Sequence, residues 1–261
     1  MLLALDVGNT QIFAGLFDKE GKILFRFRKS SKNKVTSDEY GVFLRSVLRE
    51  NHYDFFQIEA IVISSVVPDL LYSIEAACVK YLNKRPVVLT PVSPGLNIKI
   101  NVPNPQEVGS DRIATSMGAE FLFPKENKLI IDYGTATTFD VMNNKSEWCG
   151  GLIAPGFRTS MEALSSATAK LPLVEIKKPQ NIVGITTVDN IQGGLYYGAV
   201  GMAREILNKI THEYFQGQPV RLIATGGFSS LFKAEQDLFE IIEPDLILMG
   251  LWQFYLTIRE D

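Results

Sequence analysis

The chain contains little cysteine and little histidine, with two residues of each among 261. Cys78 and Cys149 form no Cys-x-x-Cys pair, which excludes a cysteine-built metal site and suits a reducing, cytoplasmic location. His52 and His212 both lie in polar, helix-like surroundings, so we expect them at the surface. A catalytic triad built on histidine, or a metal ligated by histidine, is therefore not expected.

Long apolar runs and a strong excess of one charge are also lacking. No stretch reaches the ~18 apolar residues of a membrane span. The apolar start of the chain ends at Asp6 and has no basic segment before it, so no signal peptide is expected. The net charge is −3, which argues against nucleic acid or an anionic membrane as a partner. The one basic run, over 26–34, is interpreted as a solvated strand end and turn.

Two well-known kinase signatures are missing. The chain has no G-x-x-x-x-G-K-[ST] loop and lacks the set of motifs of protein kinases. Its 46% hydrophobic and 21% charged residues are ordinary for a globular protein. At this length the chain forms either one large domain or two smaller ones with a proper core.

The hydrophobic pattern predicts an α/β protein in which one series of elements occurs twice. Each series opens with three strands, before the first helix. A connector with four prolines, over 91–109, precedes the helix that leads into the second series. The expected strands are 2–6, 12–17, 22–28, 60–68, 86–90, two within 128–142, 147–156, 220–227 and a short one at "FEII"; the expected helices are 37–51, 69–82, 110–122, 157–167, 187–213, a short one after 227 and one ending near 258.

Two polar turns interrupt the apolar strands at corresponding places in the two series. "LLALDVGNTQIFAGLF" and "KLIIDYGTATTFDVMN" share an apolar strand, an Asp-x-Gly turn and a second strand, about half the chain apart. Since the order of strands also matches, the pattern indicates an internal duplication. The alternative is that Asp6 and Asp132 merely form turns.

The composition of these turns suits phosphate binding. Glycine lets a backbone approach a ligand closely, exposed amides bind phosphate oxygens, and threonine hydroxyls add donors. A carboxylate repels phosphate, so the arrangement needs a cation between them, usually Mg²⁺. Two such turns facing each other across a cleft would bind a nucleoside triphosphate. "TGG" (225–227) could carry its adenine or ribose, although two glycines after a strand are often only a turn.

A third cluster, "EVGSDR" over 107–112, places the acidic residue Asp111 next to the basic residue Arg112 at the start of a helix. Ser110 is a candidate N-cap there. An Asp in a first helical turn often only compensates the helix dipole. Arg112 beside Asp111 can bind a carboxylate through two hydrogen bonds, which favours a substrate site.

These motifs together resemble the type III pantothenate kinases, members of the acetate kinase/sugar kinase/Hsp70/actin superfamily. The resemblance covers nearly the whole chain, and the combination and order of its motifs are specific to that family. The matching stretches are "DVGNT" (6–10), "NPQEVGSDR" (104–112), "DYGTATT" (132–138), "GGLIAPG" (150–156), "GITTVDNIQGGLYYG" (184–198), "TGG" (225–227) and "PDLILMGL" (244–251).

The resemblance implies two duplicated ribonuclease H-like (actin-like ATPase) domains, 1–109 and 110–261, with a central nucleotide cleft. It also implies phosphorylation of pantothenate to 4′-phosphopantothenate by ATP, the first step of coenzyme A biosynthesis, with Mg²⁺ and a monovalent cation, K⁺ or NH₄⁺. A homodimer is implied whose interface includes the long helix that starts near 187, and which completes the substrate site.

The roles implied for individual residues fall into four groups. Asp111 would be the catalytic base, accepting the hydroxyl proton late in a loose transition state. Asp132 would ligate the monovalent cation, and Asp6 would serve Mg²⁺ through phosphate. The implied ATP-binding residues are Asp6, Val7, Gly8, Asn9, Thr10, Gln11, Ile12, Phe13, Thr135, Gly226 and Gly227. The implied pantothenate-binding residues are Gly109, Ser110, Asp111, Arg112, Val102 and, from the partner subunit, Thr187.

Two departures from the family pattern leave the charged groups intact. Val102 stands where the family usually has a Tyr, and Ile185 and Thr186 stand where Lys-Asn is usual. Two other functions stay open: a superfamily kinase or phosphatase acting on another small substrate, and a nucleotide-binding accessory protein of transcription. Intact Asp6, Asp111 and Asp132 argue against an inactive enzyme.

Overall fold

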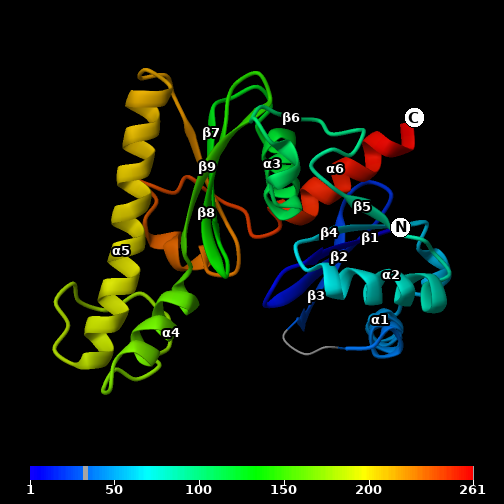
Figure 1. The fold of residues 1–261 in the computed structure, drawn as a ribbon, viewed down its shortest axis with the longest axis horizontal. Helices are drawn as coiled ribbons and strands as arrows, with labels where there is room; N and C mark the ends of the chain where they lie inside the picture. Colours follow the sequence, from blue (N-terminus) through cyan, green and yellow to red (C-terminus); the bar gives the residue numbers. More distant parts are fainter. Residues whose placement is uncertain (32–34, 261) are drawn as a thin grey trace. The chain divides into compact units, whose positions relative to one another are not determined.

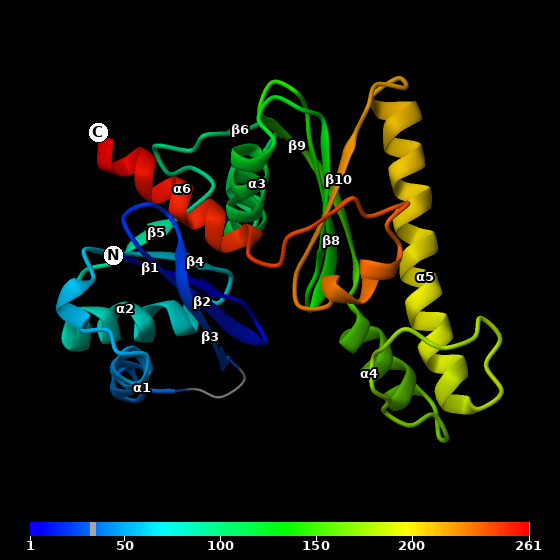
Figure 2. The same ribbon diagram turned by 180° about the vertical axis from the view of Figure 1, so that it is seen from behind.

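The computed structural model describes residues 1–31 and 35–260, so Lys32, Asn33 and Lys34 of the basic run lie outside the described residues. The described chain forms two compact units (Figures 1 and 2). The first unit comprises Met1–Pro124 and Leu246–Asp261, and the second comprises Lys125–Asp245.

The first unit is built on a sheet of order β3-β2-β1-β4-β5. β1, β2 and β3 are antiparallel neighbours, whereas β4 and β5 run parallel to β1. The elements of this unit are β1 (Leu2–Val7), β2 (Gln11–Phe17), β3 (Ile23–Ser30), α1 (Ser37–Glu50), η1 (Phe55–Gln57), β4 (Ala60–Ser65), α2 (Pro68–Leu82), β5 (Val87–Leu89), β6 (Lys99–Ile100), η2 (Pro105–Glu107), α3 (Ser110–Leu122) and α6 (Leu246–Glu260).

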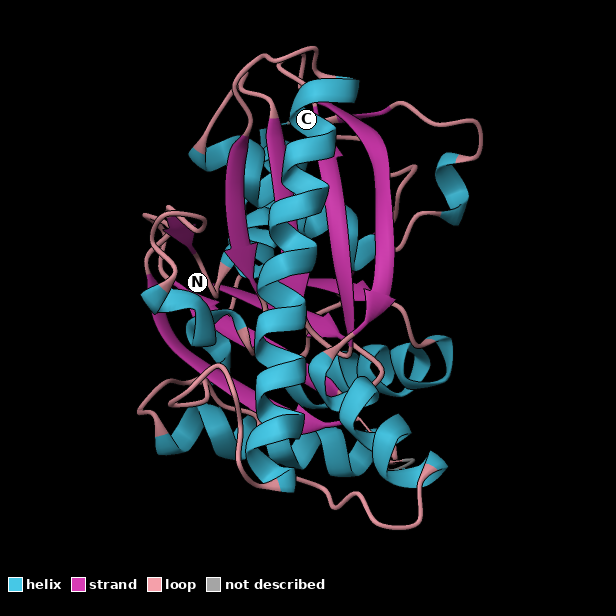
Figure 3. Ribbon diagram, turned by 90° about the vertical axis from the view of Figure 1, so that its left-hand side faces the viewer, coloured by secondary structure: helices cyan, strands magenta, loops and turns pink. Residues whose placement is uncertain are grey.

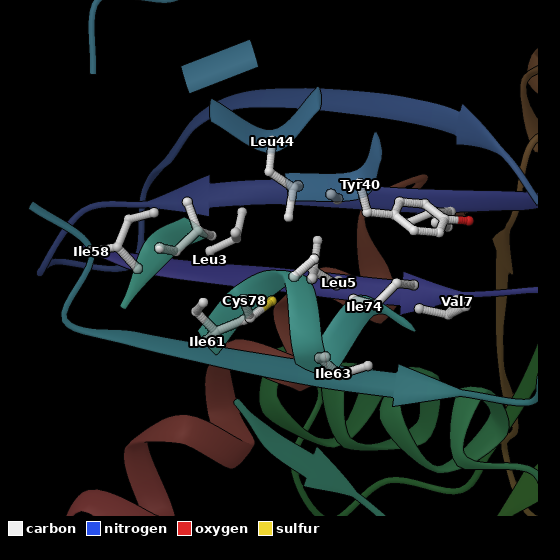
Figure 4. Close-up of a cluster of buried hydrophobic side chains, with 14 of the residues drawn as sticks. Leu3, Leu5, Val7, Tyr40, Leu44, Ile58, Ile61, Ile63, Ile74 and Cys78 are labelled. Carbon is white, nitrogen blue, oxygen red and sulfur yellow. The ribbon is translucent and has the colours of Figure 1, made fainter. Parts of the chain in front are cut away.

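One face of this sheet carries the core of the first unit. Leu3, Leu5 and Val7 alternate along β1 and point to the same side, as period-2 patterning requires. Side chains of β4, α1 and α2 complete the cluster in Figure 4, among them Ile63 and Cys78. Burial raises the pKa of the Cys78 thiol to about 12, so this cysteine is a packing residue.

The opposite face of the sheet is covered by α6. Phe17 of β2 stacks on Trp252 with ring centroids 5.4 Å apart. A Cβ added to Gly15 would come within 2.9 Å of Leu248. α6 in turn crosses α3 through Gly118 and Gly250, where each glycine contacts the backbone of the other helix. This crossing holds α3, which carries the "GSDR" motif at its start, within the first unit.

The second unit has the same strand order and the same strand directions as the first. The strands that belong to this unit run in the order β11-β10-β7-β8-β9, with β8 antiparallel to β7 and β9, and with β10 and β11 parallel to β7. Figure 3 shows the long helix α5 lying over one face of this sheet. The elements are β7 (Lys128–Tyr133), β8 (Ala136–Met142), β9 (Glu147–Pro155), α4 (Phe157–Ala167), α5 (Thr187–Lys209), the π-helical turn η3 (Ile210–Tyr214), β10 (Arg221–Thr225), η4 (Ser229–Ala234) and β11 (Ile241–Ile242).

Most predicted elements are confirmed within one or two residues, and helices 110–122 and 157–167 have the predicted bounds. Two predictions were wrong in length. The strand expected to run to Pro68 ends at Ser65, because Pro68 is the first residue of α2, where its missing N–H costs nothing. The helix expected to run to 213 ends at Lys209 and continues as a single π-helical turn.

The division predicted at 109 and 110 differs from the compact units. α3 follows that boundary in sequence, but it packs with α6 in the first unit. The halves 1–109 and 110–261 describe the repeat of motifs and stay a prediction about duplication. None of the helices described here is both long and apolar enough to cross a membrane.

Candidate functional site

The "DVGNT" turn connects β1 to β2 in the first unit. Asp6 is half-buried near the end of β1, opposite Phe13 of β2. The turn closes through a 3.0 Å hydrogen bond that the Gly8 N–H donates to the Gln11 carbonyl. Beyond Asp6 and Val7 the residues Gly8, Asn9 and Thr10 lie outside the paired strands, and the amide of Asn9 can face a phosphate.

The "GSDR" motif opens α3, but not in the predicted way. The N-cap is Gly109, with no side-chain cap, so the prediction that Ser110 caps the helix was wrong. Ser110 is buried, and its hydroxyl donates to the Ser65 carbonyl at 2.9 Å and accepts from the Ser65 N–H at 3.1 Å. It also lies 3.3 Å from the Ser64 hydroxyl. A tertiary contact with β4 has therefore taken the hydroxyl that a cap would have used.

These contacts bring two distant motifs to one edge of the sheet. Ser64 pairs with Asp6 in the parallel register of β1 and β4, so both lie on the same face. Ser110 stands on Ser64, and Val66 continues the same edge with a 3.1 Å hydrogen bond from its N–H to the Val7 carbonyl. The first unit thus places the start of α3 directly beside the end of β1.

Asp111 is the acidic group of this cluster with a perturbed pKa. Burial raises the pKa of its carboxyl, while a hydrogen bond from the Arg112 N–H, at 2.8 Å, and the charge of Arg112 act in the opposite direction. A Cβ on Gly109 would collide with the Asp111 carboxylate, which explains the glycine at that position. A carboxylate with a raised pKa accepts a proton more readily than an ordinary one.

The "DYGTATT" turn connects β7 to β8 in the second unit. Asp132 is half-buried at the end of β7 and pairs with Thr225 of β10. The next residue, Gly226, has φ +89°, and a Cβ there would collide with the Asp132 carboxylate. Gly227 faces open space, with no atom within 4 Å of an added Cβ. The second unit therefore joins "DYGTATT" to "TGG", as the first joins "DVGNT" to "GSDR".

Gly156 and Thr159 fix the second turn, although neither was predicted as a site residue. Gly156 donates a 3.2 Å hydrogen bond to the Thr135 carbonyl, and the Thr159 hydroxyl donates to the same oxygen at 2.7 Å. A Cβ on Gly156 would collide with the carbonyls of Gly134 and Thr135. The glycine that ends "GGLIAPG" was a usable signal, because a glycine before a helix often marks a close backbone approach.

Tyr133, within the "DYGTATT" motif, is fully buried, and its hydroxyl has no hydrogen-bond partner among the described residues. Its ring packs on Phe232 at 4.4 Å between centroids. We expect Tyr133→Phe to leave the free energy of unfolding unchanged or raise it by about 1 kcal/mol, since it removes an unsatisfied buried hydroxyl. Denaturant unfolding of the variant measures this change.

Tyr196 provides the matched control for that substitution. It belongs to the same aromatic cluster, but its hydroxyl donates a 2.8 Å hydrogen bond to the Glu235 carboxylate. Tyr196→Phe should therefore lower the free energy of unfolding by about 1–2 kcal/mol. Equal destabilisation by the two variants would contradict the assignment of the Tyr133 hydroxyl.

The remaining predicted site residues lie in varied surroundings. Ile12 and Phe13 are buried, with 4% and 9% of their surface exposed, so mainly their backbone is available to a ligand. Val102 is half-buried in the segment before η2. Thr187 is exposed in the first turn of α5, behind a capping box formed by Thr186 and Asp189.

Each of the two turns offers oxygen atoms that suit a cation bound together with phosphate. No three Asp, Glu, His or Cys side chains cluster as metal ligands anywhere in residues 1–31 and 35–260. A cation at Asp6 or Asp132 would combine one carboxylate with backbone, water and phosphate oxygens. Mg²⁺ in nucleotide sites is commonly bound in this way.

Comparisons with known proteins agree with the motifs. The model of a family described as type III pantothenate kinase matches residues 2–209. The type III pantothenate kinase of Legionella pneumophila (strain Corby) is 49% identical over 252 residues, which cover 96% of each chain. Type III pantothenate kinase 1 of Francisella tularensis subsp. holarctica (strain OSU18) is 44% identical over 257 residues, covering 97% of this chain and 99% of that one.

Solved structures at low identity share the fold. A Campylobacter jejuni protein described as a Baf family transcriptional activator matches with a TM-score of 0.58 at 18% identity, covering 99% of this chain and 100% of that one. The activator of the 2-hydroxyisocaproyl-CoA dehydratase from Clostridium difficile, with bound ADPNP, matches with 0.54 at 14% identity, covering 99% and 96%. The mixed α/β fold is thus that of actin-like ATPases and sugar kinases.

Proposed function

The chain belongs to the type III pantothenate kinase family, and we propose that it transfers the γ-phosphoryl group of ATP to the primary hydroxyl of pantothenate. The product is 4′-phosphopantothenate, formed in the first step of coenzyme A biosynthesis. The observation that carries this proposal is the contact of Ser110 with Ser64 and Ser65, which puts "GSDR" beside the end of β1. A phosphate-binding turn and an acid–base cluster at one sheet edge suit phosphoryl transfer to an alcohol.

Asp111 is the proposed general base. Its carboxylate is too weak a base to deprotonate an alcohol beforehand. In a loose transition state it needs only to orient the hydroxyl and accept its proton late, as the new O–P bond forms and the bond from the γ-phosphorus to the bridging oxygen of ADP breaks. The raised pKa of Asp111 favours this late transfer. Arg112 binds the pantothenate carboxylate with its guanidinium.

The substrate site in this proposal also uses backbone and partner groups. Gly109 leaves room for the Asp111 carboxylate, which a Cβ at that position would meet. Ser110 is buried and positions the start of α3 through its hydrogen bond to Ser65 of β4. Val102 offers an apolar contact in place of the tyrosine usual in the family. Thr187 reaches pantothenate from the partner subunit of a homodimer, for which its exposure at the start of α5 leaves it available.

The ATP-binding residues of this proposal lie in the two Asp-x-Gly turns and in "TGG", each within its own unit. Asp6 to Phe13 contact the ATP phosphates, mainly through backbone groups, and Thr135, Gly226 and Gly227 complete the binding of ATP. Mg²⁺ near Asp6 and K⁺ or NH₄⁺ at Asp132, when bound, neutralise phosphate charge. The common strand order of the two sheets supports the further proposal that the units are duplicated ribonuclease H-like domains. The isolated cysteines suit a cytoplasmic enzyme.

The decisive experiment is a direct assay of the purified chain. With ATP and Mg²⁺ we expect phosphorylation of pantothenate, and no comparable turnover of glycerol or sugars. Turnover of a sugar in place of pantothenate would favour another kinase of the superfamily. Nucleotide binding without any turnover would favour the accessory protein of transcription.

We expect Asp132→Asn to remove the response of the rate to monovalent cations. Without the carboxylate, K⁺ or NH₄⁺ loses its only charged protein ligand in this proposal, and the rate should fall by roughly tenfold or more. The measurement compares rates in K⁺, NH₄⁺ and Na⁺ at constant ionic strength. Asp237→Asn, an exposed carboxylate of the same unit, serves as the control. A variant Asp132→Asn that is still activated by K⁺ would refute the assignment.

A further inference from the structure

The strand β3 forms one edge of the first sheet and ends beside the "DVGNT" turn. Gln11 pairs with Ser30, and the Ser31 N–H donates a 3.0 Å hydrogen bond to the Thr10 carbonyl. The end of β3 is thus fastened to the turn. Arg28 lies two residues before Ser30, which is about 7 Å along a strand. A long side chain at that position can reach the turn.

Arg28 shares a row and a face of the sheet with Asp6. Asp6 is directly opposite Phe13, and Phe13 is directly opposite Arg28. Residues directly opposite each other on neighbouring strands point to the same face. The row Arg28, Phe13, Asp6 therefore runs across three strands on the face where Ser64 meets Ser110.

The guanidinium of Arg28 lies over the aromatic ring of its neighbour Phe13. Its Cζ lies 4.0 Å from the centroid of the Phe13 ring. A guanidinium over an aromatic ring makes a favourable cation–π contact, which restricts the positions of its N–H donors. Arg28 is exposed, and no carboxylate of residues 1–31 or 35–260 forms an ion pair with it. The donors are thereby available to an anion from solution.

From this arrangement we infer that Arg28 is a further phosphate-binding residue, whose guanidinium contacts the polyphosphate of the nucleotide at the "DVGNT" turn. The inference rests on the proposed function in taking ATP as the phosphoryl donor. The turn itself offers backbone amides and a carboxylate of the wrong sign. Arg28 supplies positive charge and a planar set of donors that match phosphate oxygens. The stacking on Phe13 lowers the entropy lost on binding.

A simpler explanation is that Arg28 only protects the edge strand. Charged residues on edge strands discourage pairing with other chains. Arg26 tests this alternative, because it lies on the same strand and the same face, paired with Gly15 and one step further from the turn. Edge protection would make the two arginines equivalent, whereas phosphate binding distinguishes them.

The test measures ATP binding by titration calorimetry, with Mg²⁺ and without pantothenate, and then kcat/KM for ATP. Arg28→Gln should weaken ATP binding and lower kcat/KM for ATP by about tenfold to a hundredfold, the effect of one charge-assisted hydrogen bond. Arg28→Lys keeps the charge but loses the planar set of guanidinium donors. Its ATP affinity and its kcat/KM for ATP should lie between those of Arg28→Gln and those of the unmodified chain. Arg26→Gln should change either quantity by less than about twofold.

Two results would overturn the inference. One is equal behaviour of Arg28→Gln and Arg26→Gln. The other is a raised KM for pantothenate with unchanged ATP binding, which would move Arg28 to the substrate carboxylate. The binding arm needs no turnover, so it stands even if the chain phosphorylates a substrate other than pantothenate. If Arg28→Gln does not fold, Arg28→Lys against Arg26→Lys makes the same comparison.

Discussion

Replacing Asp111 by Asn should lower kcat for pantothenate phosphorylation by about 10²–10⁴-fold, the usual contribution of a positioned general base. The amide occupies the same space beside Arg112 but cannot accept the hydroxyl proton. ATP binding should persist, because the carboxylate belongs to the start of α3 and not to the "DVGNT" turn. Turnover by coupled assay and ATP affinity by calorimetry give the two numbers.

Glu107→Gln is the matched control for this substitution. Glu107 is an exposed carboxylate four residues earlier, whose contact is a 3.0 Å hydrogen bond from the Asn104 side chain. Its neutralisation changes the charge of the segment without touching the proposed base. Near-normal turnover of Asp111→Asn would exclude Asp111 as the base, and an equal loss in Glu107→Gln would assign the effect to net charge.

Asp111→Asn should also raise the free energy of unfolding at neutral pH. The pKa of Asp111 is raised in the folded chain, so folding takes up a proton in the window from its ordinary value of 3.8 up to the raised value. Stability therefore falls as pH rises through that window. Asp111→Asn removes this loss, and its free energy of unfolding should exceed that of the unmodified chain above the window. Equal pH dependence of the two proteins would contradict the raised pKa.

Most helices, strands and turns could be predicted from the sequence, because the residues that determine them lie within a few positions of one another. The Asp-x-Gly turns appear as glycine between apolar strands, and both turns occupy the ends of paired strands in the structure. Helix α3 begins at the predicted residue. The repeat of the turns also predicted the common strand order, since one strand series was already visible twice in the pattern.

Contacts between segments far apart in the chain could not be predicted from the sequence. Ser110 is a residue type favoured at the N-cap, yet its hydroxyl accepts a hydrogen bond from the Ser65 N–H, 45 residues away. The row from Asp6 to Arg28 depends on strand register, which periodicity does not reveal. The mutual packing of α3 and α6 joins segments from the middle and the end of the chain, and it moved α3 across the predicted division.

The second large effect is expected at this helix crossing. A Cβ on Gly250 would collide with the backbone carbonyl of Ala114, an atom that cannot rotate away. Gly250→Ala must therefore separate α6 from α3. We expect a cost of about 3 kcal/mol from overpacking, offset by about 1 kcal/mol from the better helix propensity of alanine. The net loss of about 2 kcal/mol should lower Tm by about 4–8 °C.

Gly201→Ala separates the packing cost from the gain in propensity. Gly201 is an exposed glycine of α5, and no atom lies within 4 Å of an added Cβ. Its replacement should leave Tm unchanged or raise it, since only the propensity term acts. Because α3 carries Asp111 and Arg112, Gly250→Ala should also lower kcat/KM for pantothenate, while Gly201→Ala should not. A stable and fully active Gly250→Ala would mean that the crossing of α3 and α6 does not position the proposed base.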